Sequence, residues 1–293
     1  MIAFPSKFQY RPDVSLSENG IKKFSNVLIA GERAVVVSVE NSEIIYCKGR
    51  EHQMKSTIPK VIYWDKIVEK EFLCFPGFNH CNWYHVLTDI GFQIFLAKQL
   101  GLADTFVLPA RVKTVSQSFM QFFNLFGMKI LFIDHPRKAI KANNVVCFDR
   151  KTGRLSEAMR GGLLDKEING YFDFLYQCFL ESEWAEKTNY GDKIFSTRTG
   201  SDSRVYEKLS EIENEYQGLG YQVIHFDGMS FFEQIALMQN VTHFAGFHGA
   251  NLTNMIFARK CQQLVELVNI ELSDDFKTIA QFIGLSYRRR KLI

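Results

Sequence analysis

The segment 244–257 contains the residues with the clearest chemical potential. Its pattern predicts a buried strand, a turn and then a helix that begins near Asn251. Small residues leave room in that turn for a ligand to approach the backbone: Gly246, Gly249 and Ala250. Backbone N–H groups at the start of the helix would face this ligand with a partial positive charge, which suits a diphosphate. His248 lies in the turn, where it could donate a hydrogen bond to a phosphate oxygen.

A second group of polar residues, Asn82, His85 and Asp89, has the i, i+3, i+7 spacing of one face of a helix. Two interpretations fit this spacing. In the first, Asn82 caps the helix, His85 is a core histidine with a structural partner, and Asp89 is exposed. In the second, His85 and Asp89 face a cleft between domains, and one of them removes a proton from an attacking hydroxyl group.

Arginines form the third group. Arg198 comes directly after a predicted strand, and Arg204 follows it closely. Their guanidinium groups either form surface ion pairs or donate charge-assisted hydrogen bonds to a phosphate. The chain has no Asp-x-Asp sequence and no compact Asp/His/Glu cluster, so we expect any departing diphosphate to be stabilised without a metal. Walker A, GxGxxG and GxSxG sequences are also absent, which argues against kinases, dinucleotide oxidoreductases and serine hydrolases.

Alternating strands and helices are expected to position these groups. Residues 1–75 are strand-rich, with short strands at 27–30, 34–39 and 44–47. Further strands are predicted at 105–108, 129–133, 144–148, 193–196, 222–225, 242–245 and 263–267. Helices are predicted at 82–100, 116–126, 155–183, 204–218, 230–239, 251–257 and 274–284. The pattern indicates an α/β protein with parallel sheets and ligands at the carboxyl ends of the strands, where Glu266 also falls.

A polar stretch at 186–192 is the best candidate for a linker, so we expect domains at 1–185 and 186–293. The composition, 46% hydrophobic with 14% aromatic residues, is typical of well-packed globular domains. A net charge of +3 is too small to indicate a nucleic-acid partner. The basic segment 288–291 is interpreted as a solvated chain end, with contact to an anionic membrane as the alternative. Gln234 is interpreted as a surface amide, with a ligand contact as the alternative.

The chain has six separated cysteines and no CxxC pair, which we interpret as buried reduced thiols of a cytosolic protein. The start of the sequence lacks the pattern of a signal peptide, and no window has the ~18 uncharged apolar residues of a membrane helix. We therefore expect a soluble cytoplasmic protein that associates with a membrane at most peripherally.

In this order, the three motifs resemble glycosyltransferase family 61. Asn82-x-x-His85-x-x-x-Asp89 is similar to its N-terminal helix motif, and Arg198 and Arg204 to its paired arginines. The C-terminal block is similar in order and spacing over Phe231-x-x-Gln234-Ile235, the run 248–257 and Val265-Glu266-Leu267. The resemblance extends from about Phe72 to Tyr287. The chain departs from it at Tyr206-Glu207, where many relatives have Asn-Glu, and at Asn251, where a glycine is common.

The resemblance implies an inverting, metal-independent transferase with two Rossmann-like domains facing a cleft, the GT-B architecture. It would move a sugar, xylose or N-acetylglucosamine, from a UDP-sugar to a hydroxyl of a glycan acceptor, with no cofactor. It makes Asp89 the base or the partner of the base, and His85 the group that positions the acceptor, near Asn82. Residues that would hold the donor are Arg198, Arg204, His248, Gly249, Ala250, Asn251, Thr253 and Asn254. Glu266 would bind ribose or sugar hydroxyls, or else cap the neighbouring helix.

Two other functions would use the same pocket. A non-catalytic protein would bind a nucleotide sugar or glycan without turnover, since a fold does not fix a function. A sugar-phosphate isomerase or epimerase would need no acceptor. His85 and Asp89 favour the transferase, because a protein that only binds has no need of a base.

Overall fold

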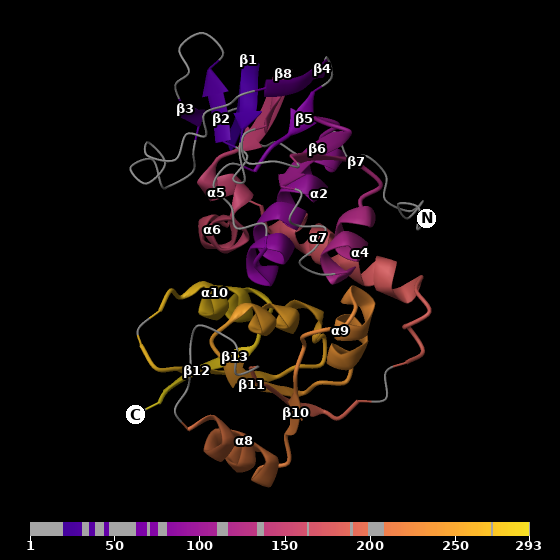
Figure 1. Cartoon of the computed structure of the whole chain (residues 1–293). Coiled ribbons are helices and arrows are strands. Elements are labelled where there is room, and N and C mark those ends of the chain that lie inside the picture. Colours follow the sequence, from indigo (N-terminus) through magenta and orange to yellow (C-terminus); the bar gives the residue numbers. More distant parts are fainter. Residues whose placement is uncertain are drawn as a thin grey trace. The chain divides into compact units, whose positions relative to one another are not determined.

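The computed structural model divides the chain into two compact units, Met1–Tyr171 and Phe172–Ile293, which are described separately (Figure 1). The division falls within helix α7 (Asp165–Leu180), and the boundary predicted at 185/186 stays a prediction. The structure describes residues 20–30, 35–38, 44–46, 63–68, 71–75, 81–109, 117–133, 138–162, 164–187, 190–198, 208–270 and 272–292.

Unit 1 is built on an eight-stranded sheet of mixed direction, with the order β3-β2-β1-β8-β5-β6-β7 and with β4 also paired to β8. Its strands are β1 (Ile21–Ala30), β2 (Val35–Ser38), β3 (Ile44–Tyr46), β4 (Tyr63–Val68), β5 (Phe72–Leu73), β6 (Thr105–Pro109), β7 (Lys129–Ile133) and β8 (Lys138–Phe148). The strands β1, β2 and β3 pair antiparallel, and β1 also pairs antiparallel with β8. The predicted strands are present, but the strand-rich start joins the α/β sheet and makes it mixed.

The parallel part of this sheet includes the order β8-β5-β6-β7, and β4 is also parallel to β8. The chain runs from β5 outward to β6 and β7, and then returns to place β8 on the other side of β5. The strand order therefore reverses between β5 and β8, and α/β folds bind ligands at the carboxyl ends of strands at such a point. The helical segment with His85 begins shortly after β5, next to this point.

The helices of unit 1 differ from the prediction in two places. Helix α2 (Gly91–Gln99) and helix α4 (Gln117–Asn124) match predicted helices, but α2 is preceded by a π-helical stretch, η2 (His85–Ile90). The single long helix predicted at 155–183 is wrong. Gly162, in the left-handed conformation with φ 63°, ends α6 (Leu155–Gly161) before α7 begins, and a short unpredicted helix, α5 (Arg150–Gly153), precedes α6.

Unit 2 is a five-stranded parallel sheet with the order β10-β9-β11-β12-β13. Its strands are β9 (Lys193–Ser196), β10 (Gln222–Ile224), β11 (His243–Phe247), β12 (Gln263–Val268) and β13 (Ser286–Lys291). Counted along the chain this is the doubly wound order 2-1-3-4-5, whose reversal point lies between β9 and β11. Arg198 follows β9 and His248 follows β11, so the two predicted phosphate contacts lie at that point.

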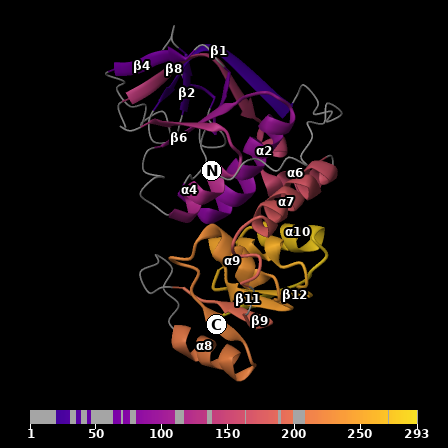
Figure 2. The ribbon, with the colours of Figure 1, turned by 90° about the vertical axis from the view of Figure 1, so that its right-hand side faces the viewer.

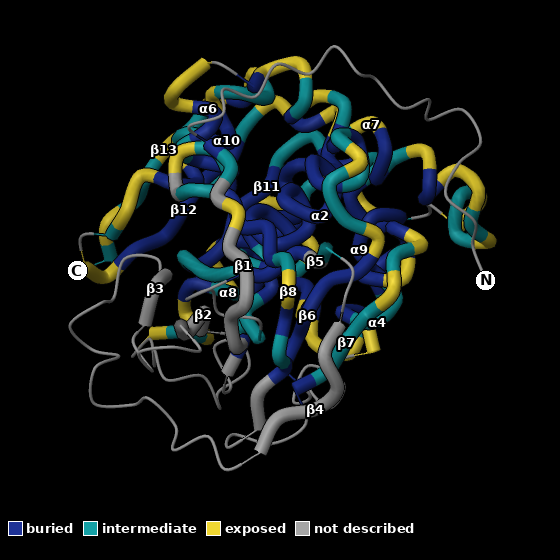
Figure 3. The backbone as a smooth tube through the Cα atoms, turned by 90° about the horizontal axis from the view of Figure 1, so that it is seen from above, coloured by how far each residue is buried: buried dark blue, intermediate teal, exposed yellow. Residues whose placement is uncertain are grey.

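Helices cover both faces of this sheet (Figures 1 and 2). Helix α8 (Leu209–Gly218) lies on one face, while α9 (Phe231–Met238) and α10 (Asp275–Phe282) lie on the other. The segment η3 (Ala250–Phe257) is a 3₁₀-helix and not the predicted α-helix. Burial follows the sheet, because β12 is dark blue over most of its length in Figure 3 and the edge strand β13 is half-buried or exposed.

The strand β13 overturns the interpretation of 288–291 as a solvated chain end. It pairs in parallel with β12, from Gln263 opposite Ser286 to Val268 opposite Lys291. Two arginines of this strand form ion pairs, Arg289 with Glu266 and Arg290 with Glu215. The basic run is therefore part of the sheet, because the successive residues Arg289 and Arg290 point to opposite faces and each pairs with a carboxylate there.

Four of the cysteines predicted as buried thiols are buried and free: Cys74, Cys147, Cys178 and Cys261. Cys81 is free and half-buried, and Cys47 lies outside the described residues. In the parts of the chain that the structure describes, no helix is both long and apolar enough to span a bilayer.

Candidate functional site

The first candidate site lies where η2 begins in unit 1. Its backbone is π-helical, with Gly91 N–H bonded to the carbonyl of Val86 five residues earlier. Isolated π-helical turns occur frequently at functional sites. His85 Nδ1 lies 2.8 Å from Asp89 Oδ2, and the His85 side chain is 31% exposed whereas that of Asp89 is fully buried. The interpretation in which Asp89 is exposed is therefore wrong.

Each carboxylate oxygen of Asp89 has a polar neighbour, His85 at Oδ2 and the Thr88 hydroxyl at Oδ1. The hydroxyl of Thr88 lies 3.1 Å from Asp89 Oδ1 and 2.6 Å from the carbonyl oxygen of Tyr84. A hydrogen bond from this imidazole to a carboxylate that only accepts requires the ring proton on His85 Nδ1. Nε2 is then the nitrogen that can take up a proton, and the hydrogen bond to Asp89 fixes the orientation of the imidazole from the buried side.

Two buried residues support this pair from neighbouring elements. The Gln93 amide donates to the carbonyl oxygens of Asp89 (3.1 Å) and Gly153 (3.0 Å), which ties η2 to the segment after β8. The Tyr171 hydroxyl donates to the Leu87 carbonyl over 2.5 Å. Burial, and then the negative charge of Asp89, raises the pKa of Tyr171 well above its ordinary value, so this phenol stays a neutral donor.

Asn82 is near this pair in sequence but makes no side-chain hydrogen bond with it. Its Oδ1 is buried and has no hydrogen-bond partner among the described residues. The predicted stripe of three residues is thus one hydrogen-bonded pair, His85 and Asp89, with Asn82 apart from it. Thr88 and Gln93 were missed by sequence reasoning, because a single helix period does not identify π-helical neighbours.

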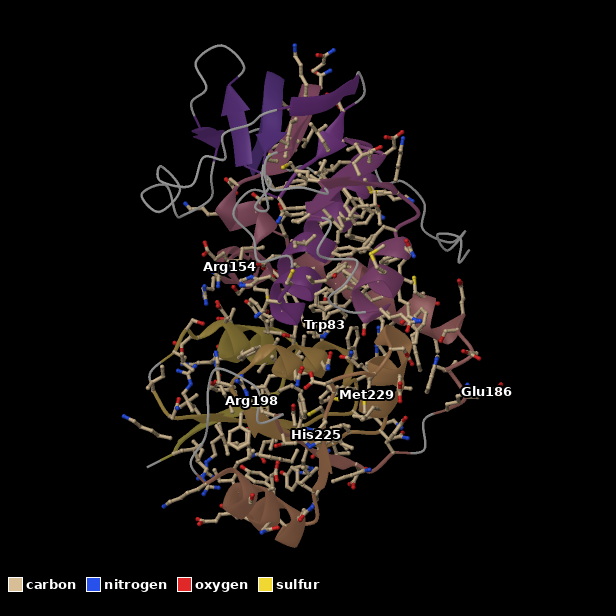
Figure 4. The ribbon with its side chains drawn as sticks, in the orientation of Figure 1. Trp83, Arg154, Glu186, Arg198, His225 and Met229 are labelled. Carbon is tan, nitrogen blue, oxygen red and sulfur yellow. The ribbon has the colours of Figure 1, made fainter. Side chains whose placement is uncertain are left out.

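The second candidate site lies in unit 2, at the carboxyl ends of β9 and β11. Arg198, which is labelled in Figure 4, donates a hydrogen bond from Nη2 to the carbonyl oxygen of His248. The end of β9 is held by Thr197, whose N–H donates to the Ile224 carbonyl over 3.0 Å and whose hydroxyl donates to Glu213. These bonds fix the point at which the Arg198 side chain leaves the sheet.

Two glycines here lie very close to other atoms of the protein. A Cβ on Gly246 would lie 2.7 Å from the carbonyl oxygen of Ser196 in the neighbouring strand. A Cβ on Gly249 would collide with the guanidinium of Arg198. The space beside Gly249 is occupied by Arg198, and the predicted reason for these glycines, room for a ligand, stays a prediction.

The imidazole of His248 is held by a buried carboxylate. His248 Nδ1 is hydrogen-bonded to Glu266 Oε1; the Glu266 side chain is fully buried and that of His248 is 12% exposed. The ring also packs edge-on against Phe276, with centroids 5.1 Å apart. As with His85, a carboxylate on Nδ1 leaves Nε2 as the nitrogen that a ligand can reach.

The other oxygen of Glu266 is bound by the edge strand. Tyr287 donates its hydroxyl to Oε2, and Arg289 Nε lies 3.1 Å from the same atom. Burial alone would raise the pKa of Glu266, but the hydrogen bonds from His248 and Tyr287 and the charges of His248 and Arg289 outweigh it and lower this pKa. Glu266 is therefore an ionised group with both oxygens occupied. Tyr287 and Arg289 were missed, because the basic run was not interpreted as a strand.

The turn after His248 is connected to α9 through a buried amide pair. Asn254 donates from Nδ2 to Gln234 Oε1 over 3.0 Å, and Gln234 donates to the Met229 carbonyl over 3.3 Å. Gln234 is 5% exposed, so its interpretation as a surface amide is wrong. Thr253 is also fully buried, and its Oγ1 has no hydrogen-bond partner within the described part of the chain.

The other residues predicted to bind the donor are partly described by the structure. Gly249, Ala250 and Asn251 are half-buried at the start of η3, beside His248. Arg204 lies outside the described residues. Among the residues that are described, no group of three or more His, Cys, Asp or Glu side chains is arranged to hold a metal ion.

Comparison with known proteins gives one match to a family. The family model described as Glycosyltransferase 61 matches residues 83–265, which is more than half of the chain. This stretch includes His85, Asp89, Arg198 and His248, and it ends one residue before Glu266. None of the curated proteins compared matches the chain.

Proposed function

This chain belongs to glycosyltransferase family 61, and from that membership we propose that it transfers a sugar from a UDP-sugar to a hydroxyl group of a glycan acceptor. The observation that carries the proposal is the meeting of Arg198 and His248 at the reversal point of the parallel sheet in unit 2. A family of glycosyltransferases needs a donor site, and these two side chains offer donors suited to a diphosphate.

In the proposed donor site, Arg198 and His248 bind the diphosphate. Arg198 contributes a permanent positive charge, and the protonated imidazole of His248 donates from Nε2 to the diphosphate while its Nδ1–H donates to Glu266. Both groups are held by protein contacts, so they need little rearrangement when charge builds on the leaving diphosphate. We assign Glu266 the role of orienting His248 and not that of a contact to ribose, because both of its oxygens are occupied.

On the acceptor side we propose His85 as the general base and Asp89 as the residue that orients it. His85 is the partly exposed member of the pair, and its Nε2 is the atom that would take the proton from the acceptor hydroxyl. Asp89 is buried, and its charge would stabilise the imidazolium that forms, as a carboxylate does in other histidine-dependent enzymes. The deprotonated oxygen would then attack the anomeric carbon and displace UDP, with inversion in a single step.

We further propose that the reaction needs no metal, because fixed cationic donors would stabilise the diphosphate. Xylose and N-acetylglucosamine are the proposed donor sugars. For the architecture we propose the GT-B type, with two Rossmann-like domains. A cytoplasmic location is also proposed, and the free thiols of the described cysteines are consistent with a reducing compartment.

The test is incubation of the purified protein with UDP-xylose, UDP-N-acetylglucosamine or UDP-galactose and candidate glycan acceptors, with UDP release and product anomer as readouts. Activity that persists in EDTA and a product of inverted configuration are the expected results. His248→Ala is expected to weaken UDP binding, whereas His243→Ala, at the opposite end of the same strand, serves as the matched control. Binding of UDP without turnover with any acceptor would favour a non-catalytic binding protein instead.

A further inference from the structure

The edge strand β13 carries two side chains, Tyr287 and Arg289, that bind the buried carboxylate of Glu266 in the proposed donor site. Glu266 on β12 is directly opposite Arg289 on β13, and side chains two residues apart on a strand point to the same face. Tyr287 and Arg289 therefore share the face of Glu266, while Arg290 points to the other face and binds Glu215 of α8. Neither Tyr287 nor Arg289 lies in the stretch matched by the family.

Arg289 is fixed more firmly than a surface arginine. Besides Glu266, it binds Asp274 Oδ1 at 2.9 Å through Nη1 and the Ser273 carbonyl at 2.9 Å through Nη2. Its Nε also lies 2.9 Å from the Tyr287 hydroxyl. The guanidinium thus joins the loop before α10 to the carboxylate that holds His248, and its position is set from three directions.

Glu266 depends on these two partners. Its side chain is fully buried, and an ionised carboxylate that loses its hydrogen bonds in a protein interior is strongly disfavoured. The bonds from Tyr287 and Arg289 to Oε2 keep the carboxylate charged and fix its rotation. With that rotation fixed, Oε1 stays on His248 Nδ1, and the proton of the imidazole is held on the buried side when the ring is neutral.

We propose that Tyr287 and Arg289 are positioning residues for the donor site, acting on His248 through Glu266. The inference rests on the proposed function, which makes His248 a contact to the diphosphate. Its prediction for the orientation and protonation of the His248 ring holds whether or not the donor is a UDP-sugar. Sequence that lies beyond the family match would thereby contribute to binding of the diphosphate. The lowered pKa of Glu266 agrees with a carboxylate that these donors keep ionised.

The test uses Tyr287→Phe, which removes only the hydroxyl, and Arg289→Met, with Arg289→Lys as the conservative variant. Arg290→Lys is the matched control, since it disturbs the neighbouring ion pair with Glu215 on the opposite face of the same strand. Two quantities are measured: the Kd for UDP, and the ¹⁵N shifts of the histidine rings in protein labelled at histidine. His225, which is exposed at the end of β10, is the internal reference for the shifts.

We expect Tyr287→Phe to weaken UDP binding by about 5-fold and Arg289→Met by roughly 10-fold or more, as for lost hydrogen bonds to a buried charge. Arg289→Lys should recover part of the loss, and Arg290→Lys should leave Kd unchanged. The ring shifts of His248 should move in the first two variants and not in the control. Unchanged His248 shifts in a folded Arg289→Met variant would overturn the proposal. If the wild-type protein binds no UDP, the proposed donor fails, while the His248 shifts still decide the positioning role.

Discussion

His85 is the exposed end and Asp89 the buried end of one hydrogen bond of 2.8 Å. The difference in exposure assigns separate roles to two residues that the sequence alone leaves interchangeable. The imidazole can be reached from solvent, whereas the carboxylate cannot. Asp89 can act only through His85, by holding its proton on Nδ1 and by stabilising its charged form.

Asp89→Asn is therefore expected to lower kcat by about 10²- to 10⁴-fold, within the range that a lost or misplaced base produces. The amide can donate a hydrogen bond to Nδ1 and so move the proton of His85 to Nε2, the wrong nitrogen for a base. The Kd for UDP should change little, because Asp89 has no part in the proposed donor site. Asp173→Asn, at a surface ion pair with Arg259, is the control. A kcat within twofold of wild type would remove Asp89 from the mechanism.

The second prediction concerns the space between Gly249 and Arg198. A methyl group at position 249 would occupy the place of the guanidinium, so Gly249→Ala should displace Arg198 and weaken UDP binding. We expect a loss of roughly 10-fold, as for one charge-assisted contact. Gly218→Ala, where a Cβ meets nothing within 4 Å, is the matched control and should raise Tm slightly, since alanine favours a helix. Equal UDP affinity in both variants would show that Arg198 does not bind the diphosphate.

Much of the fold was predictable because each unit alternates strands and helices with clear turn residues. The buried runs at β9, β11 and β12 and the glycine after α8 are strong local signals, and these three strands and α8 are present. The edge strand β13 was missed for a physical reason. Its arginines resemble a solvated tail until Glu266 and Glu215 are known to lie beside them, and no local pattern reveals such long-range partners.

The candidate sites show the same limit. The positions of His85, Asp89, Arg198 and His248 at strand ends and helix starts are visible in the sequence, and their role as site residues stays a prediction. The burial of polar side chains could not be predicted from the sequence. Gln234 was placed on the surface, although its amide meets Asn254 inside unit 2. A polar residue on a helix can be buried if another element supplies a hydrogen-bond partner for it, and the local sequence does not reveal such a partner.

The third prediction follows from the lowered pKa of Glu266, which hydrogen bonds from His248 and Tyr287 and nearby positive charge produce against the effect of burial. Because its pKa in the folded protein lies below the unfolded value, Glu266 stabilises the fold fully above that value, near 4.5, and this stabilisation is lost as the pH falls through the folded pKa. Glu266→Gln should therefore be less stable than wild type at pH 7, by a difference that shrinks below pH 4.5.

Urea unfolding between pH 7 and pH 3, followed by far-UV circular dichroism, measures this difference. Glu211→Gln, at an exposed site on α8, is the control and should follow the wild-type curve. A difference between wild type and Glu266→Gln that stays constant down to pH 3 would contradict an ionised, hydrogen-bonded Glu266.

The last prediction concerns the buried amide pair of Gln234 and Asn254. Each single change to alanine leaves a buried amide of the other residue without its partner, so we expect each to destabilise the fold by about 1–3 kcal/mol. Gln234→Ala also removes the donor of the Met229 carbonyl and thereby loosens the loop before α9 from the turn after His248. The double variant should cost less than the sum of the single ones, because the second change removes a group that is already unpaired. Urea unfolding of the four proteins gives the coupling energy, and the Kd for UDP gives its consequence. If the two effects add and UDP binding is unaffected, the pair is ordinary core and does not hold the donor turn in place.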